Sequence, residues 1–261
     1  SEVCARTALA AWLLKRPVQM IYRRADDMQS TSKRHPAEIS YKIGVDDSGK
    51  LLAGEVDIHL NAGAYATLSS VVSFRAATQA LGPYQVPNVR VHSTAWYTNL
   101  PPTGAFRGFG SPQATFGHER MMDQVARQIG MDPVEFRLRN ILKPGSSTTT
   151  GHRLETSVGA EETIDAAVKL ADYSDTVSKC KLESDERYRY GVGVSACHYG
   201  NCLGSPGWEL DGSGARIQIH RDGSVAVAYG LVDMGQGATT VVTQMTAEAL
   251  GIDPKLVTVL Q

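Results

Sequence analysis

Apolar positions along the chain recur first at helical and then at strand spacing. Apolar side chains at 5, 8, 9, 12 and 13 predict a helix over residues 1–15, which Pro17 ends. Alternation of apolar and polar residues then predicts strands, and these cover 18–22, 38–45, 51–60 and 89–96. The sequence Asp-Asp-Ser-Gly at 46–49 joins the second and third of them as a hairpin.

Helical spacing returns in the middle of the chain. One helix is predicted over 112–129, with Ser111 as N-cap and Pro112 as first helical residue. A second begins at Asp132-Pro133 and stops at Lys143-Pro144-Gly145, and a third covers 161–171.

The last part of the chain restarts the strand pattern. We expect a strand at 191–197, a glycine-rich loop at 200–214, a hairpin of 215–220 and 224–229, a helix at 238–250 and a strand at 256–260. The charged segment 172–189 has few large aliphatic residues. The sequence therefore predicts an α+β protein of two α/β subdomains, with mixed or antiparallel sheets flanked by helices. They would cover 1–175 and 190–261, with a linker at 176–189.

Composition excludes several function classes. A net charge of −1 over 261 residues gives no electrostatic reason to bind nucleic acid or an anionic membrane. No apolar run reaches the roughly 18 residues of a membrane-spanning helix. The 4 cysteines form no C-x-x-C pair and the 7 histidines no H-x-x-x-H pair, so we expect no protein-ligated metal. Free thiols suit a reducing compartment, and we expect a cytoplasmic protein.

The segment 104–110 places two phenylalanines and an arginine among three glycines. Glycines let backbone approach a ligand closely, while Arg107 and Phe109 offer a fixed charge and a stacking face. An ordinary connector whose phenylalanines fill the core would show the same spacing, so the residues alone leave both interpretations open.

A second glycine-containing loop, Asp-Met-Gly-Gln-Gly at 233–237, stands between a predicted strand and a predicted helix. Backbone N–H groups at a helix N-terminus bind anions and polar ligands, and Gln236 can both donate and accept. A simple strand-to-helix turn is the alternative.

Both loops resemble a known family. Residues 104–113 resemble the loop that molybdenum hydroxylases of the xanthine dehydrogenase/aldehyde oxidase family place over their molybdopterin cofactor, and 233–237 is similar to that family's second cofactor loop. Four more stretches are similar to the family in the same order, at 16–18, 33–36, 61–65 and 84–89.

The resemblance implies roles for individual residues. The cofactor-binding residues would be Phe106, Arg107, Gly108, Met234, Gly235, Gln236 and Gly237. Phe109 would line the substrate channel, and Arg75, thirteen residues before Asn88, would contact substrate. A solvated arginine on a helix is the alternative for Arg75. Purine-oxidising relatives carry an aromatic residue where this chain has Ala196, unless His198 or Tyr199 takes that place.

The resemblance also implies what lies elsewhere. The family's catalytic glutamate stands in a Gly-Val-Gly-Glu segment beyond the second loop, and the chain contains no such segment after residue 237. We therefore expect an internal piece of a catalytic molybdopterin-binding subunit, with no catalytic residue of its own and inactive alone. The complete, oligomeric enzyme would oxidise an aldehyde, purine or other N-heterocycle using water, with iron–sulfur clusters and FAD on other domains or subunits.

Two rivals remain. One is a non-catalytic assembly or interaction module that keeps the fold without the cofactor. The other, a nucleotide-binding enzyme, is disfavoured because G-x-G-x-x-G and a P-loop lysine are both missing.

Overall fold

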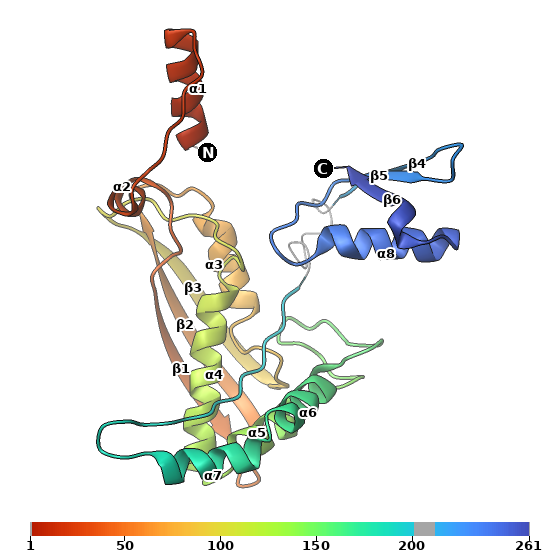
Figure 1. Cartoon of the computed structure of the whole chain (residues 1–261). Helices are drawn as coiled ribbons and strands as arrows, with labels where there is room; N and C mark the ends of the chain where they lie inside the picture. The colour runs from red at the N-terminus through yellow and green to blue at the C-terminus, as the bar shows by residue number, and fades with distance from the viewer. Residues whose placement is uncertain (1, 201–211, 261) are drawn as a thin grey trace. The chain divides into compact units, whose positions relative to one another are not determined.

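The computed structural model describes residues 2–200 and 212–260 (Figure 1). The chain divides into two compact units, Ser1–Tyr199 and Gly200–Gln261. The described residues form eight α-helices and two three-stranded mixed sheets. This confirms the predicted α+β class.

The first unit contains a sheet of three long strands and seven helices. The strands are β1 (Ala37–Val45), β2 (Leu51–Gly63) and β3 (Asn88–Tyr97). The helices are α1 (Glu2–Leu14), α2 (Arg24–Ser30), α3 (Ser69–Thr78), α4 (Ser111–Gln128), α5 (Pro133–Asn140), α6 (Ala160–Leu170) and α7 (Tyr173–Glu183).

The sheet has one antiparallel and one parallel pair. β1 and β2 form the predicted hairpin, while β2 and β3 run parallel, joined through α3. One sheet face alternates inward apolar residues such as Val56, Ile58 and Leu60, all at most 1% exposed, with outward polar ones. Helices α3 and α4 cover that apolar face (Figure 1). The core of the unit therefore lies between the sheet and these two helices.

Helix α4 begins one residue earlier than the sequence predicted. Gly110, in the left-handed region at φ 92°, is the N-cap, so Ser111 is already helical and Pro112 is the second helical residue. The N-cap prediction for Ser111 was wrong because a glycine can take the left-handed turn that ends the preceding loop. In α5 the predicted cap is confirmed: the Asp132 side chain accepts from the backbone N–H groups of Val134 and Glu135.

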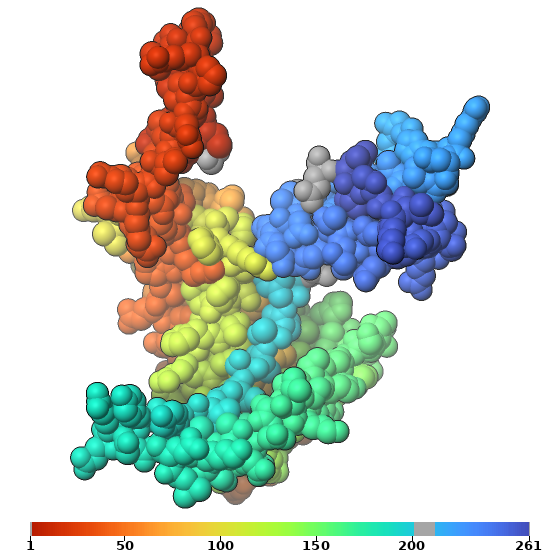
Figure 2. All heavy atoms as spheres, viewed as in Figure 1, coloured from red at the N-terminus to blue at the C-terminus, as the bar shows by residue number. Residues whose placement is uncertain are grey.

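Two predicted strands are absent from both sheets. Residues 18–22 and 191–197 lie in described parts of the chain but have no regular structure. A strand needs a hydrogen-bonded neighbour, and the side chains of 18–22 alternate in burial without one. Figure 2 shows the segment before residue 200 crossing over α4, where the Ala196 N–H donates to the Glu119 carboxylate at 2.8 Å.

The second unit repeats the sheet pattern on a smaller scale. β4 (Ala215–Ile219) and β5 (Val225–Tyr229) form the predicted hairpin, and β6 (Val257–Leu260) pairs with β5 in parallel. Helix α8 (Ala238–Leu250) and the short 3₁₀ helix η2 (Pro254–Leu256) lie between β5 and β6 in the chain. Most of the predicted glycine-rich loop at 200–214 lies outside the described residues.

The predicted linker at 176–189 begins inside helix α7, which the sequence did not predict. The subdomain limits 1–175 and 190–261 remain a prediction. Within residues 2–200 and 212–260, no helix is long and apolar enough to cross a membrane.

Candidate functional site

The loop between β3 and α4 has a backbone that only its sequence permits. Gly108, Phe109 and Gly110 are three consecutive residues with positive φ, at 96°, 53° and 92°. A Cβ added to Gly110 would lie 2.3 Å from the Val72 carbonyl oxygen, so the loop touches the backbone of α3. The glycine at 110 is therefore needed both for its conformation and for the close approach.

Phe109 is the unusual member of this trio. A bulky residue in the left-handed region is a true outlier and costs on the order of 1–3 kcal/mol. Phe109 is partly buried and packs against the core cluster, which helps to hold it there. The two interpretations of this residue are thus not exclusive: the ring contacts the core and still presents part of its surface. Backbone strain of this kind concentrates at ligand sites.

Phe106 and Arg107 stand at the exposed tip of the loop. The Phe106 ring is 51% exposed, and Arg107 is exposed as well. Phe106 also accepts, through its carbonyl, the N–H of Phe109 at 2.8 Å, which closes a tight turn. These residues are available to a ligand rather than used in the core.

Arg75 lies on α3 and is 5% exposed. Its guanidinium carbon is 4.5 Å from the centroid of the Tyr199 ring, a cation–π contact. This burial contradicts the alternative of a solvated helix arginine. Next to Tyr199, burial and then the positive charge of Arg75 lower the pKa of His198, which keeps that imidazole neutral. Ala196 itself is buried, so Tyr199 is the residue of this segment that meets Arg75.

The 233–237 loop leads into α8 with two left-handed glycines, Gly235 at φ 96° and Gly237 at φ 79°. The Asp233 carboxylate accepts from the Gly235 N–H at 2.7 Å and from the Thr239 N–H at 3.4 Å. Hydrogen bonds from these backbone groups hold the pKa of Asp233 below its usual range. In this conformation Asp233 caps the helix end that was predicted to receive a ligand.

The side chain of Gln236 folds back onto its own loop. Its Oε1 accepts from the Met234 N–H at 2.6 Å, and its Nε2 donates to the Val232 carbonyl at 3.0 Å. A primary amide has two donors and two acceptor lone pairs, so one of each remains for a ligand. Gln236 and Met234 are both exposed. The loop geometry fits a polar cofactor, with Gln236 fixing the loop as well as facing outward.

Sequence reasoning missed a buried polar cluster behind the first loop. Glu119 on α4 accepts from the Tyr84 hydroxyl at 2.6 Å and from Arg137 Nε at 2.9 Å. Arg137 is fully buried and also pairs with Asp123 at 2.9 Å. Burial, reinforced by the Glu119 charge, raises the pKa of Tyr84 above its usual range. This cluster ties α4 to α5 and so fixes the helix that follows the loop.

His118 precedes Glu119 and is 1% exposed. Burial lowers its pKa to about 4, and the positive charge of Arg137 adds to that shift. A signal for both residues was present in the sequence: His118 and Glu119 stand three or four residues before Met122 on the apolar face of a helix. A titratable residue at a core position of a helix calls for a buried partner.

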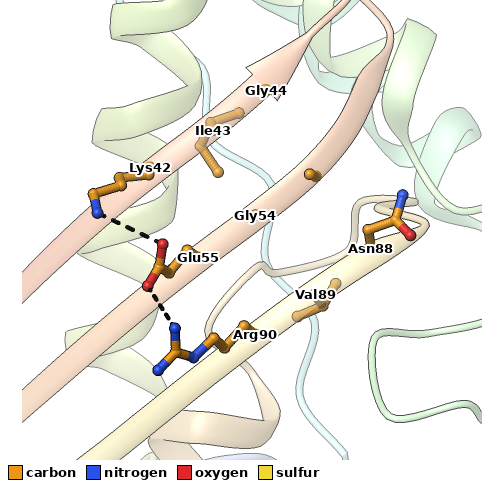
Figure 3. Close-up of a pocket in the computed structure, with 9 residues that line it drawn as sticks. Lys42, Ile43, Gly44, Gly54, Glu55, Asn88, Val89 and Arg90 are labelled. Carbon is orange, nitrogen blue, oxygen red and sulfur yellow. Dashed lines mark hydrogen bonds and ion pairs between the residues drawn. The ribbon is translucent and has the colours of Figure 1, made fainter.

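Two surface hollows lie elsewhere on the first unit. One follows the outer face of the sheet, where Glu55 on β2 lies between Lys42 and Arg90 and pairs with both (Figure 3). The other runs between β1 and α4 and includes Arg34, Gln113 and Phe116. Neither contains a predicted site residue.

Known proteins share both the sequence and the fold of this chain. Two models of molybdopterin cofactor-binding domains match residues 2–141 and 166–261. The chain belongs to the molybdopterin-binding domains of the xanthine dehydrogenase/aldehyde oxidoreductase family.

Relatives of this molybdopterin-binding domain are longer proteins. It is 34% identical over 244 residues to a probable xanthine dehydrogenase chain of Bacillus subtilis, covering 94% of this chain and 32% of that protein. It is 43% identical over 170 residues to the nicotinate dehydrogenase large molybdopterin subunit of Eubacterium barkeri, covering 65% of this chain and 40% of that one. The solved aldehyde oxidoreductase of Desulfovibrio gigas superposes with a TM-score of 0.82 at 32% identity, over 98% of this chain and 28% of that chain.

Proposed function

We propose that this chain is part of the catalytic molybdopterin-binding subunit of a molybdenum hydroxylase that oxidises an aldehyde, a purine or another N-heterocycle using water. The observation that carries the proposal is the left-handed run Gly108–Phe109–Gly110, which keeps a strained aromatic residue beside an exposed arginine. A connector with no ligand has no need of that strain.

The residues fit the cofactor in chemistry. In this proposal Phe106, Arg107 and Gly108 bind it from the first unit, and Met234, Gly235, Gln236 and Gly237 bind it from the second. When bound, the molybdenum cofactor supplies the two-electron redox chemistry. The exposed guanidinium of Arg107 suits an anionic ligand, and the left-handed glycines keep side chains out of its way.

Phe109 and Arg75 act on the substrate in this proposal. The Phe109 ring stacks on an aromatic substrate, while the Arg75 guanidinium, held against Tyr199, faces a carbonyl or carboxylate oxygen. A relative named for nicotinate, an aromatic carboxylate, supports that use of an arginine. Orientation of the substrate against the cofactor is the contribution of these two side chains.

The remaining parts of the reaction belong to the rest of the protein. The base would be a glutamate beyond residue 261, and iron–sulfur and flavin partners would take the electrons. Relatives named as subunits support an assembly of this kind. The two subdomains, 1–175 and 190–261, would each provide one cofactor loop.

Purification of the full-length protein tests the proposal against its rival, the non-catalytic module. We expect about one molybdenum per subunit by elemental analysis, and oxidation of benzaldehyde, xanthine or nicotinate with an artificial electron acceptor. Full-length protein that folds without molybdenum and oxidises none of the three would favour the module.

A further inference from the structure

A short segment before β1 runs beside the candidate cofactor loop. The Lys33 carbonyl accepts from the Gly104 N–H at 3.0 Å, and Lys33 and Thr103 form an isolated parallel bridge. Two residues later, the His35 carbonyl accepts from Gln113 Nε2 at 3.2 Å, in the first turn of α4. The segment 33–35 therefore contacts the loop at its start and the helix just after its end.

Arg34 makes the contact between those two anchor points. Its Nη2 donates to the carbonyl oxygen of Arg107 at 2.7 Å, across 73 residues of sequence. Its guanidinium carbon also lies 4.6 Å from the centroid of the Phe106 ring. One side chain thus contacts both the backbone of Arg107 and the ring of Phe106.

The planar guanidinium suits this double task. It can stack on a ring and donate in its own plane at the same time, whereas an ammonium group is a point charge without a stacking face. The hydrogen bond is charge-assisted, which makes it stronger than one between neutral groups. Because the Phe106 ring is half exposed, core packing alone does not fix the tip of the loop, and the contact with Arg34 supplies the missing constraint.

The charge of Arg34 also stays near the loop. Within residues 2–200 and 212–260 no carboxylate forms a salt bridge with Arg34, whereas its neighbour Lys33 pairs with Asp27 at 3.3 Å. A positive charge that faces a carbonyl rather than a carboxylate still attracts an anionic ligand.

We infer that Arg34 is a positioning residue that holds the tip of the 104–110 loop in its binding conformation. It acts by holding the Arg107 carbonyl and the Phe106 ring. That the loop binds molybdopterin rests on the proposed function; the tether itself does not.

Trypsin gives a direct readout of the tether in the full-length protein. Arg107 is exposed, and the peptide bond that trypsin would cleave after it carries the carbonyl that Arg34 binds. Cleavage of a folded protein follows the population of locally open conformations. We expect Arg34→Ala to raise the rate of cleavage between Arg107 and Gly108 about tenfold, and Arg34→Lys, which keeps a donor but loses the stacking plane, to raise it about threefold.

Arg90→Ala is the matched control. Arg90 is another arginine of the same unit, exposed on β3 and paired with Glu55 at 3.2 Å (Figure 3). Its removal should leave cleavage at Arg107 unchanged. Molybdenum content provides the second measurement, and we expect it to fall severalfold in Arg34→Ala and to be unchanged in Arg90→Ala.

The outcomes separate the tether from the role in binding. Equal cleavage rates for the wild type, Arg34→Ala and Arg34→Lys would overturn the tether, and Arg34→Lys decides the matter alone if Arg34→Ala does not fold. Faster cleavage with unchanged molybdenum content would overturn the role in binding. A wild-type protein without molybdenum would refute the proposed function, while the cleavage rates would still decide on Arg34.

Discussion

Removal of the Glu119 carboxylate should destabilise the first unit far more than removal of an exposed carboxylate. Glu119 is 7% exposed and accepts three hydrogen bonds, from Tyr84, Arg137 and Ala196. Breaking a buried ion pair by deleting one partner typically costs about 3–5 kcal/mol, because the other charge stays buried. Arg137 is fully buried but keeps Asp123 as a second partner, so we expect a loss near the lower end of that range for Glu119→Ala.

Glu119→Gln should cost less, about 1–2 kcal/mol, because only charge assistance is lost. A glutamine of the same shape can place its oxygen where Arg137 and the Ala196 N–H donate, and turn its amide toward the Tyr84 hydroxyl, which can accept instead. All three hydrogen bonds then survive.

Urea unfolding of the 261-residue chain, followed by circular dichroism, measures both changes as shifts in midpoint at constant slope. Glu161→Gln is the control, since Glu161 pairs with Lys143 at the surface and such pairs contribute at most about 1 kcal/mol. Equal shifts for Glu119→Ala and Glu161→Gln, or a larger loss for Glu119→Gln than for Glu119→Ala, would refute this reasoning.

Three further outcomes are expected. In the full-length enzyme, Phe109→Ala should lower kcat/KM for aromatic substrates about two- to tenfold more than for small aliphatic aldehydes, because a stacking contact is worth about 0.5–1.5 kcal/mol; equal losses would assign Phe109 to the core alone. Gln236→Glu should fold but lose molybdenum, since it removes the donor to the Val232 carbonyl and adds a negative charge, whereas Gln244→Glu on the exposed side of α8 should keep the metal; equal metal contents would argue against a cofactor role. The free energy of unfolding should fall by about 3 kcal/mol between about pH 6.5 and about pH 4, because the folded state holds the pKa of His118 near 4 and only the unfolded state gains that proton; His118→Gln should flatten this part of the urea-midpoint profile, and an unchanged profile would exclude the effect.

Local patterns in the sequence predicted the elements that local chemistry decides. The hairpin of β1 and β2 was predicted because alternating residues flank an aspartate- and glycine-containing turn. The start of α5 was predicted because Asp132 and Pro133 suit the first turn of a helix in any context. The predicted strands at 18–22 and 191–197 were wrong because alternation reports a side that is buried, not a neighbour that pairs.

Contacts between distant segments were beyond the reach of the sequence. Nothing in the spacing of Glu119 and Arg137 shows that α4 and α5 bring them to 2.9 Å. Arg75 had a solvated alternative because only the folded chain places Tyr199 against it. Helix α3 was missed for a related reason: its serines and valines are poor helix formers, and packing on β3 and α4 stabilises it.

The parallel pairing of β2 with β3 separates what folds from what recognises. Both strands end at the same edge of the sheet, and the backbone there is joined by hydrogen bonds from the Ala64 N–H to the Leu100 carbonyl and from the Thr98 N–H to the Gly63 carbonyl. The segment that follows β2 leads to α3, and the one that follows β3 leads to the 104–110 loop. Side chains beyond this edge can be exchanged without disturbing the buried strands. Relatives with the same scaffold are thereby free to acquire different substrates through a few substitutions along one rim.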